Sequence, residues 1–268
     1  MSTPAAPHPI RLSMLDTPFL VHGSDEAALA EVRRLLAPFV TRHREPAARV
    51  VHLGRGAGSA GAFGELMIHL NATALSRADC LAVHAGVVAR DGRVAAFPGG
   101  SGAGKSTLVA ACLLVGLDYV SDEALCLSWP DGAVLRYPRP LALSGWATRL
   151  LGVGGEGGAG VRGEAGDGDE GREHYLTATE LSAEVAAEPL TLTHVVLLDR
   201  QDGVSAGLRP TGRREVAAAL LERSFTHWKR PERAFELAHE MAGRAEPWQL
   251  TLGDPRAAAA LVAGLLTG

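Results

Sequence analysis

The most informative residues of this chain lie at positions 99–106, Gly-Gly-Ser-Gly-Ala-Gly-Lys-Ser, which fit the pattern G-x-x-x-x-G-K-[ST] in full. The preceding residues 92–98 are predicted to form a short buried strand, and residues 107–114 an apolar helix. A glycine-rich loop between a strand and a helix is the setting of a phosphate-binding loop. Because both the full motif and its flanks are present, we favour this interpretation over an ordinary glycine-rich turn.

The residue types of this loop suit a nucleoside triphosphate. Gly99, Gly102 and Gly104 let the backbone turn tightly, so that successive N–H groups and the start of the following helix can bind an anion. The ammonium group of Lys105 would reach the β- and γ-phosphates, and the hydroxyl of Ser106 would ligate Mg²⁺. We therefore expect ATP and Mg²⁺ as cofactors. The expected cofactor-binding residues are Gly99, Gly100, Ser101, Gly102, Ala103, Gly104, Lys105, Ser106 and Thr107.

Composition limits the class of protein. The chain has 268 residues, enough for one large domain or two small ones, and 47% of them are hydrophobic, which indicates a globular fold. The formal net charge of -4 and scattered Lys and Arg give no reason to expect a nucleic acid. The pairs at 213–214 and 229–230 are predicted to lie on solvated helix faces.

Three cysteines, Cys80, Cys112 and Cys126, lie in apolar runs without metal-ligand spacing, so we expect buried free thiols. Residues 1–20 lack the pattern of a signal peptide, and the chain has no uncharged apolar stretch of membrane-spanning length. These observations favour a cytoplasmic protein that does not bind a membrane.

Alternating and helical hydrophobic patterns predict the elements that hold the loop. Several of the predicted strands follow one another through turns too short for crossover connections, as at Asp91-Gly92 and Asp131-Gly132, so a mixed rather than a purely parallel sheet is expected. Strands are predicted within 10–24 and at 49–53, 81–89, 119–128, 134–137, 191–198 and 248–252, and helices at 25–39, 63–80, 213–224, 231–242 and 255–266.

Residues 152–171 differ from the rest of the chain, because ten of the twenty are glycine and five are acidic. Such a composition cannot build a core, so we expect a mobile loop. The composition leaves open whether the loop is a surface insertion or a flap over a substrate.

Three segments together resemble the HPr kinase/phosphorylase superfamily: Val83–Val87, Phe97–Thr107 and Val120–Glu123. The chain is most similar to the divergent HPr-kinase-related proteins, which include kinases of some lasso-peptide clusters. The resemblance implies an α/β fold with a mixed-sheet, P-loop nucleotide-binding core of the HPr kinase/phosphoenolpyruvate carboxykinase type, and a small N-terminal α/β portion. We accordingly expect residues 1–80 to pack on a kinase core formed by residues 81–268.

The resemblance also implies roles for four residues. Asp122 matches the acid that accepts the proton of the substrate hydroxyl and lies near the metal, and Glu123 matches a second acid that helps to hold Mg²⁺. His84 matches a histidine beside the phosphates, although a histidine in an apolar strand is also compatible with a core position. Arg139 follows the acid pair and would supply positive charge to the transferred phosphoryl group, or form a salt bridge at the rim.

Departures from the bifunctional enzyme narrow the expected activity. Thr107 replaces an acidic residue, Glu123 replaces Asp, and the Gly-Arg-Asn signature associated with phosphorylase activity has no match. A reverse phosphorylase reaction and HPr as substrate are therefore not expected.

The sequence favours an ATP- and Mg²⁺-dependent kinase for a Ser or Thr hydroxyl of a peptide or protein, with a lasso precursor peptide as one candidate. Two alternatives stay open. One is a kinase for a small hydroxylated metabolite or antibiotic, bound in a compact pocket lined by Trp146 and Arg139. The other is a non-catalytic, ATP-dependent regulator. The resemblance is also compatible with a homo-oligomer.

Overall fold

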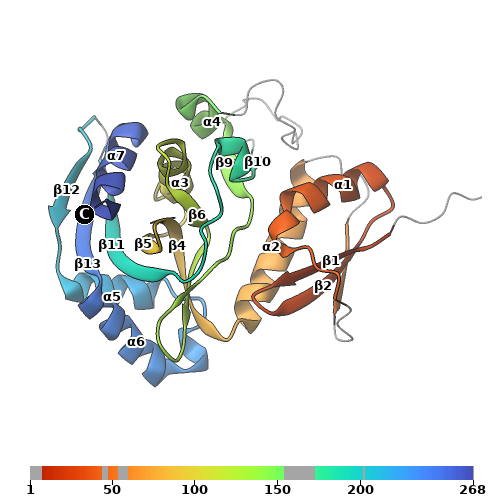
Figure 1. Ribbon diagram of the computed structural model, residues 1–268, viewed down its shortest axis with the longest axis horizontal. Helices are drawn as coiled ribbons and strands as arrows, with labels where there is room; N and C mark the ends of the chain where they lie inside the picture. Colours follow the sequence, from red (N-terminus) through yellow and green to blue (C-terminus); the bar gives the residue numbers. More distant parts are fainter. Residues whose placement is uncertain (1–7, 44–47, 54–59, 154–172, 202, 268) are drawn as a thin grey trace, which may run out of the picture.

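The computed structural model describes residues 8–43, 48–53, 60–153, 173–201 and 203–267 (Figure 1). Apart from its first two residues, the predicted glycine-rich loop at 152–171 lies outside these ranges.

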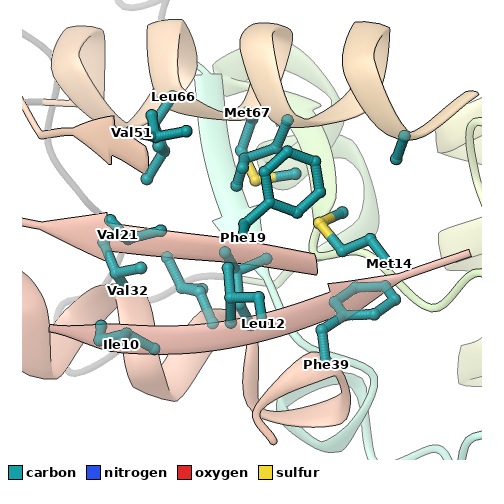
Figure 2. Close-up of a cluster of buried hydrophobic side chains, with 14 of the residues drawn as sticks. Ile10, Leu12, Met14, Phe19, Val21, Val32, Phe39, Val51, Leu66 and Met67 are labelled. Carbon is teal, nitrogen blue, oxygen red and sulfur yellow. The ribbon is translucent and has the colours of Figure 1, made fainter. Parts of the chain in front are cut away.

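The N-terminal part of the chain forms a three-stranded sheet covered by helices. β1 pairs antiparallel with β2, and β2 pairs parallel with β3. Side chains of the hairpin, among them Phe19, face Met67 of the long helix α2 (Figure 2). The elements are β1 (Ile10–Met14), β2 (Thr17–His22), α1 (Glu26–Leu35), the 3-10 helix η1 (Ala37–Phe39), β3 (Arg49–His52) and α2 (Ala60–Arg77).

The hairpin within residues 10–24 corrects the sequence expectation of a single strand. Leu15 and Asp16 form its two-residue turn with φ angles of 46° and 59°. Both values lie in the left-handed region, where glycine or asparagine is the usual occupant, so the sequence carried no turn signal. The N-terminus of α1 is clearer, because the Asp25 carboxylate accepts from the amide of Ala27 at 2.9 Å.

The rest of the chain is built on an eight-stranded sheet in the order β12-β13-β11-β5-β4-β7-β8, with β6 paired to β4. β11 is parallel to both β5 and β13, whereas β4 is antiparallel to β5, β6 and β7. The expected α/β fold with a mixed sheet is therefore confirmed. The strands are β4 (Cys80–Arg90), β5 (Arg93–Pro98), β6 (Asp118–Ser121), β7 (Ala124–Ser128), β8 (Val134–Leu135), β11 (Thr191–Arg200), β12 (Gly207–Pro210) and β13 (Glu246–Leu252).

Helices cover both faces of this sheet (Figure 1). Buried side chains of α3 (Lys105–Leu114) and α7 (Pro255–Leu266) form one core with the strands, and those of α5 (Arg213–Glu222) and α6 (Pro231–Arg244) form a second. A third core joins α2 and the N-terminal sheet to the β4–β7 end of the large sheet. The remaining elements are β9 (Leu141–Ser144), α4 (Gly145–Leu151), β10 (Glu173–Leu176) and the 3-10 helices η3 (Thr179–Leu181) and η4 (His227–Lys229).

The two basic pairs behave differently. Arg213 and Arg214 are exposed on α5, as predicted. Lys229 is partly buried at the end of η4, which corrects the prediction for that residue, whereas Arg230 is exposed at the N-terminus of α6. The ammonium group of Lys229 donates to the Ala78 carbonyl at 2.7 Å, and Arg230 pairs with Asp79 at 2.8 Å. These two cations fasten η4 to the short connection between α2 and β4.

Two further expectations concern the whole chain. Cys80, Cys112 and Cys126 are free and buried, as predicted. Within the described ranges, the structure has no helix both long and apolar enough to span a membrane.

Candidate active site

The glycine-rich loop leads from β5 into α3. Gly102 and Gly104 have φ angles of 78° and 90°, a conformation that side chains with a Cβ rarely adopt. Leu108 donates the first helical hydrogen bond, to the Gly104 carbonyl at 3.0 Å. The amides of residues 105–107 come before that bond and lack a helical acceptor, so they are available to an anion.

This loop lies at the edge of the sheet where the parallel strands β5, β11 and β13 all end. Open α/β sheets bind ligands in the crevice at that edge. Here the crevice is a cleft of about 820 Å³. Its lining includes Ser101, Gly102, Gly104, Lys105, Ser106 and Thr107, whereas Gly99, Gly100 and Ala103 form the turn behind them. The exposed side chains of Trp146, Leu150 and Val204 line it as well.

The acid pair is held by a buried serine at the end of β6. The hydroxyl of Ser121 accepts hydrogen bonds from the amides of Glu123 and Ala124, at 3.2 and 3.1 Å. Ser121 is fully buried, so this small turn is fixed between β6 and β7. β6 and β5 are both antiparallel to β4, so β6 ends at the same edge of the sheet as β5. The turn therefore brings the acids beside the glycine loop.

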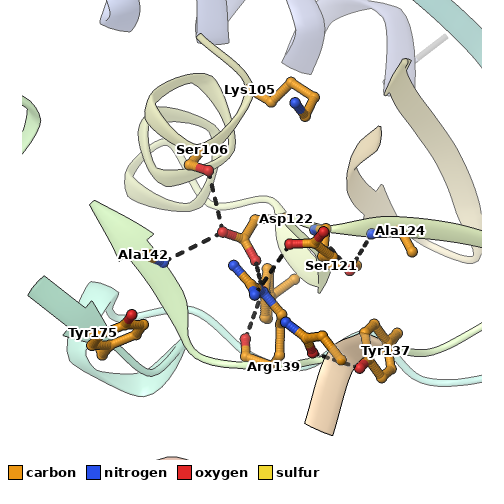
Figure 3. Close-up of polar contacts among 12 residues, drawn as sticks. Lys105, Ser106, Ser121, Asp122, Ala124, Tyr137, Arg139, Ala142 and Tyr175 are labelled. Carbon is orange, nitrogen blue, oxygen red and sulfur yellow. Dashed lines mark hydrogen bonds and ion pairs between the residues drawn. The ribbon is translucent and has the colours of Figure 1, made fainter. Parts of the chain in front are cut away.

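Asp122 has no exposed side-chain surface and three hydrogen-bond donors around it. Its Oδ2 accepts from the Ser106 hydroxyl at 3.2 Å and the Ala142 amide at 3.4 Å, and its Oδ1 accepts from Arg139 Nε at 2.9 Å. The Tyr119 hydroxyl lies 3.1 Å from Oδ1, but its one proton goes to the nearer Arg139 carbonyl at 2.6 Å. Figure 3 shows Ser106 and Ala142 approaching the carboxylate from two different elements. A carboxylate in this setting is rigid, and its Oδ2 faces Ser106 at the cleft.

Glu123 has a different environment, although it is the next residue. Its side chain is 21% exposed and pairs with Arg139 Nη1 at 3.1 Å. Arg139 therefore bridges both acids, and its own side chain is only 10% exposed. Burial opposes the charge of Arg139, but Asp122 and Glu123 outweigh it and raise the pKa above its ordinary value. The expected rim salt bridge is thus a buried one.

His84 is placed between the acid pair and the loop. Its Nδ1 lies 3.0 Å from the Glu123 carbonyl, an acceptor, so Nδ1 carries the proton and Nε2 can accept from the Lys105 ammonium group at 3.0 Å. Burial, with the charge of Lys105, lowers the pKa of His84, which agrees with a neutral ring. Lys105 also donates to the Gly100 carbonyl at 2.7 Å. His84 therefore orients Lys105.

The structure brings together every side chain that the sequence singled out for chemistry, and it adds others. The Arg223 guanidinium group lies beside the loop, where a Cβ added to Gly100 would be 3.3 Å from its Nη1. Its charge lowers the pKa of Lys105, after burial as the main cause, and opposes the effect of the acid pair. Arg223 and the Tyr119 hydroxyl belong to no motif, so only the three-dimensional fold could reveal them.

Mg²⁺ fits this site only as an ion that arrives with the nucleotide. Among the described residues, no group of three His, Cys, Asp or Glu side chains could form a metal site. Mg²⁺ is usually held by one or two carboxylates together with phosphate oxygens and water. Ser106 Oγ and Asp122 Oδ2, 3.2 Å apart, are a donor set of that kind.

A second cavity, of about 540 Å³, meets the cleft at Glu123. Both cavities are lined by Glu123, Arg139, Ala142 and Glu173. On its other side the second cavity is lined by one face of α2 and by Phe225. The two cavities therefore share a wall made of the site's charged residues.

No protein-family model matches this chain, and no curated protein matches it either. The resemblance drawn from the sequence motifs thus remains an expectation. The chemistry of the site has to be argued from its own geometry.

Proposed function

We propose that the chain is an ATP- and Mg²⁺-dependent kinase with a P-loop core of the HPr kinase type, acting on a Ser or Thr hydroxyl of a peptide or protein. The main support is the contact of Ser106 with Asp122 at 3.2 Å, in a cleft that also contains Lys105. A glycine loop, a lysine and a serine–aspartate pair are the parts that position a triphosphate and its metal.

In this proposal the amides of residues 105–107, Lys105 and Arg223 surround the phosphates. Lys105 exchanges its contacts with His84 and the Gly100 carbonyl for phosphate oxygens. Mg²⁺, held by Ser106 and Asp122, neutralises charge on the β- and γ-phosphates when bound. The purine base packs on Trp146, which is 49% exposed in the cleft.

We assign the general base to Glu123 rather than to Asp122, as the sequence had suggested. A base must come within hydrogen-bond reach of the hydroxyl proton that it accepts. Glu123 is partly exposed and lines both cavities, whereas Asp122 has no exposed side-chain surface and already accepts from Ser106, Arg139 and the Ala142 amide.

The step balances as follows. The acceptor oxygen forms a bond to the γ-phosphorus, and the bond from that phosphorus to the β–γ bridging oxygen breaks. The hydroxyl proton passes to the Glu123 carboxylate, and ADP leaves with its charge. Catalysis then rests on positioning and electrostatic stabilisation, as is usual for phosphoryl transfer.

The test is an acceptor screen with γ-labelled ATP and Mg²⁺. The acceptors are a panel of Ser- and Thr-containing peptides and, separately, a pool of hydroxylated metabolites. Wild type is compared with Lys105→Ala, Glu123→Gln and Asp122→Asn, and Glu232→Gln, at an exposed position of α6 outside both cavities, serves as a carboxylate control. ATP binding is measured in parallel by titration calorimetry.

Label on peptides that Glu123→Gln loses while it still binds ATP supports the proposal. If Asp122→Asn keeps metal-dependent ATP binding but alone loses transfer, the base is Asp122 instead. Label confined to metabolites moves the protein to the small-molecule kinases. ATP binding without any labelled product would favour the regulator.

A further inference from the structure

The second cavity runs along α2 as a groove. The α2 residues that line it recur every three to four positions from Gly64 to Ser76, so they form one continuous stripe on the helix. At the helical rise this stripe is about 18 Å long. An extended peptide advances about 3.3 Å per residue, so the groove has room for about five residues. A compact metabolite would leave most of it empty.

Apolar side chains are unusually accessible in this groove. Ile68 is 72% exposed and Phe225 is 38% exposed, and both line it, whereas the apolar lining residues Met67 and Leu75 are buried. Isolated exposed apolar residues are common on protein surfaces, but here they line a concavity that ends at an acid pair. A ligand with apolar side chains would remove them from water.

The charges of the groove differ from those of the cleft. Its titratable lining residues are Arg139, Glu123, Glu173 and Tyr175, and Arg139 is already paired with two carboxylates. Within the described residues, the groove thus offers no unpaired cation to an acidic or phosphorylated ligand. An uncharged acceptor suits it better.

Specific contacts hold α2 against the site. Asn71 Oδ1 accepts from the Tyr137 hydroxyl at 2.7 Å, and the Phe63 ring packs edge-on against Tyr175 at 4.8 Å. Gly64 permits this approach, because a Cβ there would lie 3.1 Å from the Tyr175 hydroxyl. The distance between the helix stripe and the acid pair is therefore fixed by the fold.

We propose that this groove binds the phosphoryl acceptor as an extended peptide, with a Ser or Thr flanked by apolar residues. The hydroxyl reaches Glu123 from the α2 side, while ATP reaches the same wall from the cleft. The N-terminal part of the chain, through α2, thereby selects the acceptor. The assignment rests on the proposed kinase function, since it identifies the groove by its position at the proposed base.

The first experiment fills the groove. Ala72 is exposed on the α2 stripe, so Ala72→Trp adds a large side chain without disturbing a core. His69→Trp is the matched control, because His69 is exposed on the same helix but does not line the groove. The probe is a library of octapeptides with a central serine and neighbours drawn from Ala, Leu, Phe and Gln, used with γ-labelled ATP.

We expect Ala72→Trp to lower kcat/KM for the peptides at least tenfold and to leave the Kd for ATP unchanged. His69→Trp should behave as wild type. Equal transfer by wild type and Ala72→Trp would overturn the groove assignment and leave the kinase proposal intact. Transfer confined to hydroxylated metabolites, unaffected by Ala72→Trp, would overturn both the groove assignment and the peptide acceptor of the proposed function.

A second experiment measures peptide binding in the groove independently of phosphoryl transfer. The three natural cysteines are buried, so Ala72→Cys adds an accessible thiol whose alkylation by iodoacetamide can be followed. We expect the octapeptide library to slow this alkylation severalfold, and not to slow that of a His69→Cys control. Protection without label transfer would support the groove and refute the kinase. Label transfer without protection would refute the groove assignment and support the kinase.

Discussion

The cleft and the groove meet at one wall, yet they are built for different ligands. The cleft has backbone amides, Lys105 and Arg200 in its lining, whereas the groove has exposed aliphatic and aromatic side chains. Adjacent residues of a single turn serve them unequally: Asp122 lines the cleft, and Glu123 lines both cavities. The comparison teaches that two adjacent acidic residues can face different cavities, because one side chain is buried and the other is partly exposed.

Breaking the shared wall is expected to have the largest effect. Arg139→Met leaves the fully buried Asp122 without its ion-pair partner, so we expect a loss of about 3–5 kcal/mol in the free energy of unfolding, measured by urea denaturation. Arg244→Met is the control, because that exposed pair with Glu240 at 3.9 Å is worth at most about 1 kcal/mol. A small effect at Arg139 would mean that packing rather than charge maintains the wall.

A substitution that affects only the cleft is expected to have the next largest effect. Lys105→Ala removes the cation that faces the phosphates, and we expect kcat for phosphoryl transfer to fall about 10²–10³-fold, as when one charge-stabilising donor is lost. Arg213→Ala, on an exposed face of α5, should leave kcat unchanged. Normal iodoacetamide protection of Ala72→Cys by peptide in the Lys105→Ala background would show that the groove is independent. A kcat within twofold of wild type would contradict the assignment of Lys105.

Most of the large sheet and the loop could be predicted from the sequence, because both have local signals. The helix at 255–266 coincides with α7, where Pro255 begins the helix and the Asp254 carboxylate caps it. The strands β9, β10 and β12 were missed, because they are short and carry no turn-bounded alternation. Their pairing depends on distant segments rather than on local propensity.

The residues of the site also differ in whether the sequence could predict them. Lys105 and Ser106 could be named from a spacing rule, whereas the closeness of Arg139 to the acid pair depends on how the chain after β8 crosses the edge of the sheet. Arg223 and the groove-lining face of α2 carry no motif. Burial of Asp122 could not be foreseen either, since an acid in a turn is usually exposed.

Weakening only the groove should give a moderate effect. Phe225→Ala removes a partly exposed ring from the groove, and we expect KM for acceptor peptides to rise severalfold, or about 1 kcal/mol. Because this ring also packs edge-on against His84, with 5.4 Å between the ring centroids, KM for ATP should rise by a smaller factor. Phe235→Ala, on an exposed part of α6 outside both cavities, is the control. A parallel rise in both KM values would mean that Phe225 supports the wall and not the acceptor alone.

The smallest expected effect lies outside both cavities and concerns pH. Burial lowers the pKa of His194 in β11; Glu246 opposes this shift, and Arg93 adds to it. Below about pH 6.5 the unfolded chain binds a proton at this residue that the folded chain does not. Stability should therefore fall as the pH drops from about 6.5 toward the lowered pKa, by less than about 1.4 kcal/mol per pH unit.

His194→Gln should flatten this pH dependence in urea titrations. It should change neither KM for ATP nor KM for peptide, because His194 lines neither cavity. An unchanged slope would show that other groups cause the loss of stability in acid.

The fastening of η4 to the connection between α2 and β4 has a mechanical consequence. Lys229 and Arg230 hold the two residues that join the helix stripe to the strand bearing His84. A hinge needs free dihedral angles at just such a connection, but Ala78 is buried here, with its amide bonded to the Ala74 carbonyl and its own carbonyl bonded to Lys229. The acceptor wall and the phosphate loop should therefore move as one rigid body. Acceptors would then be selected by their fit to a preformed groove. Their association would be governed by diffusion and shape rather than by domain closure.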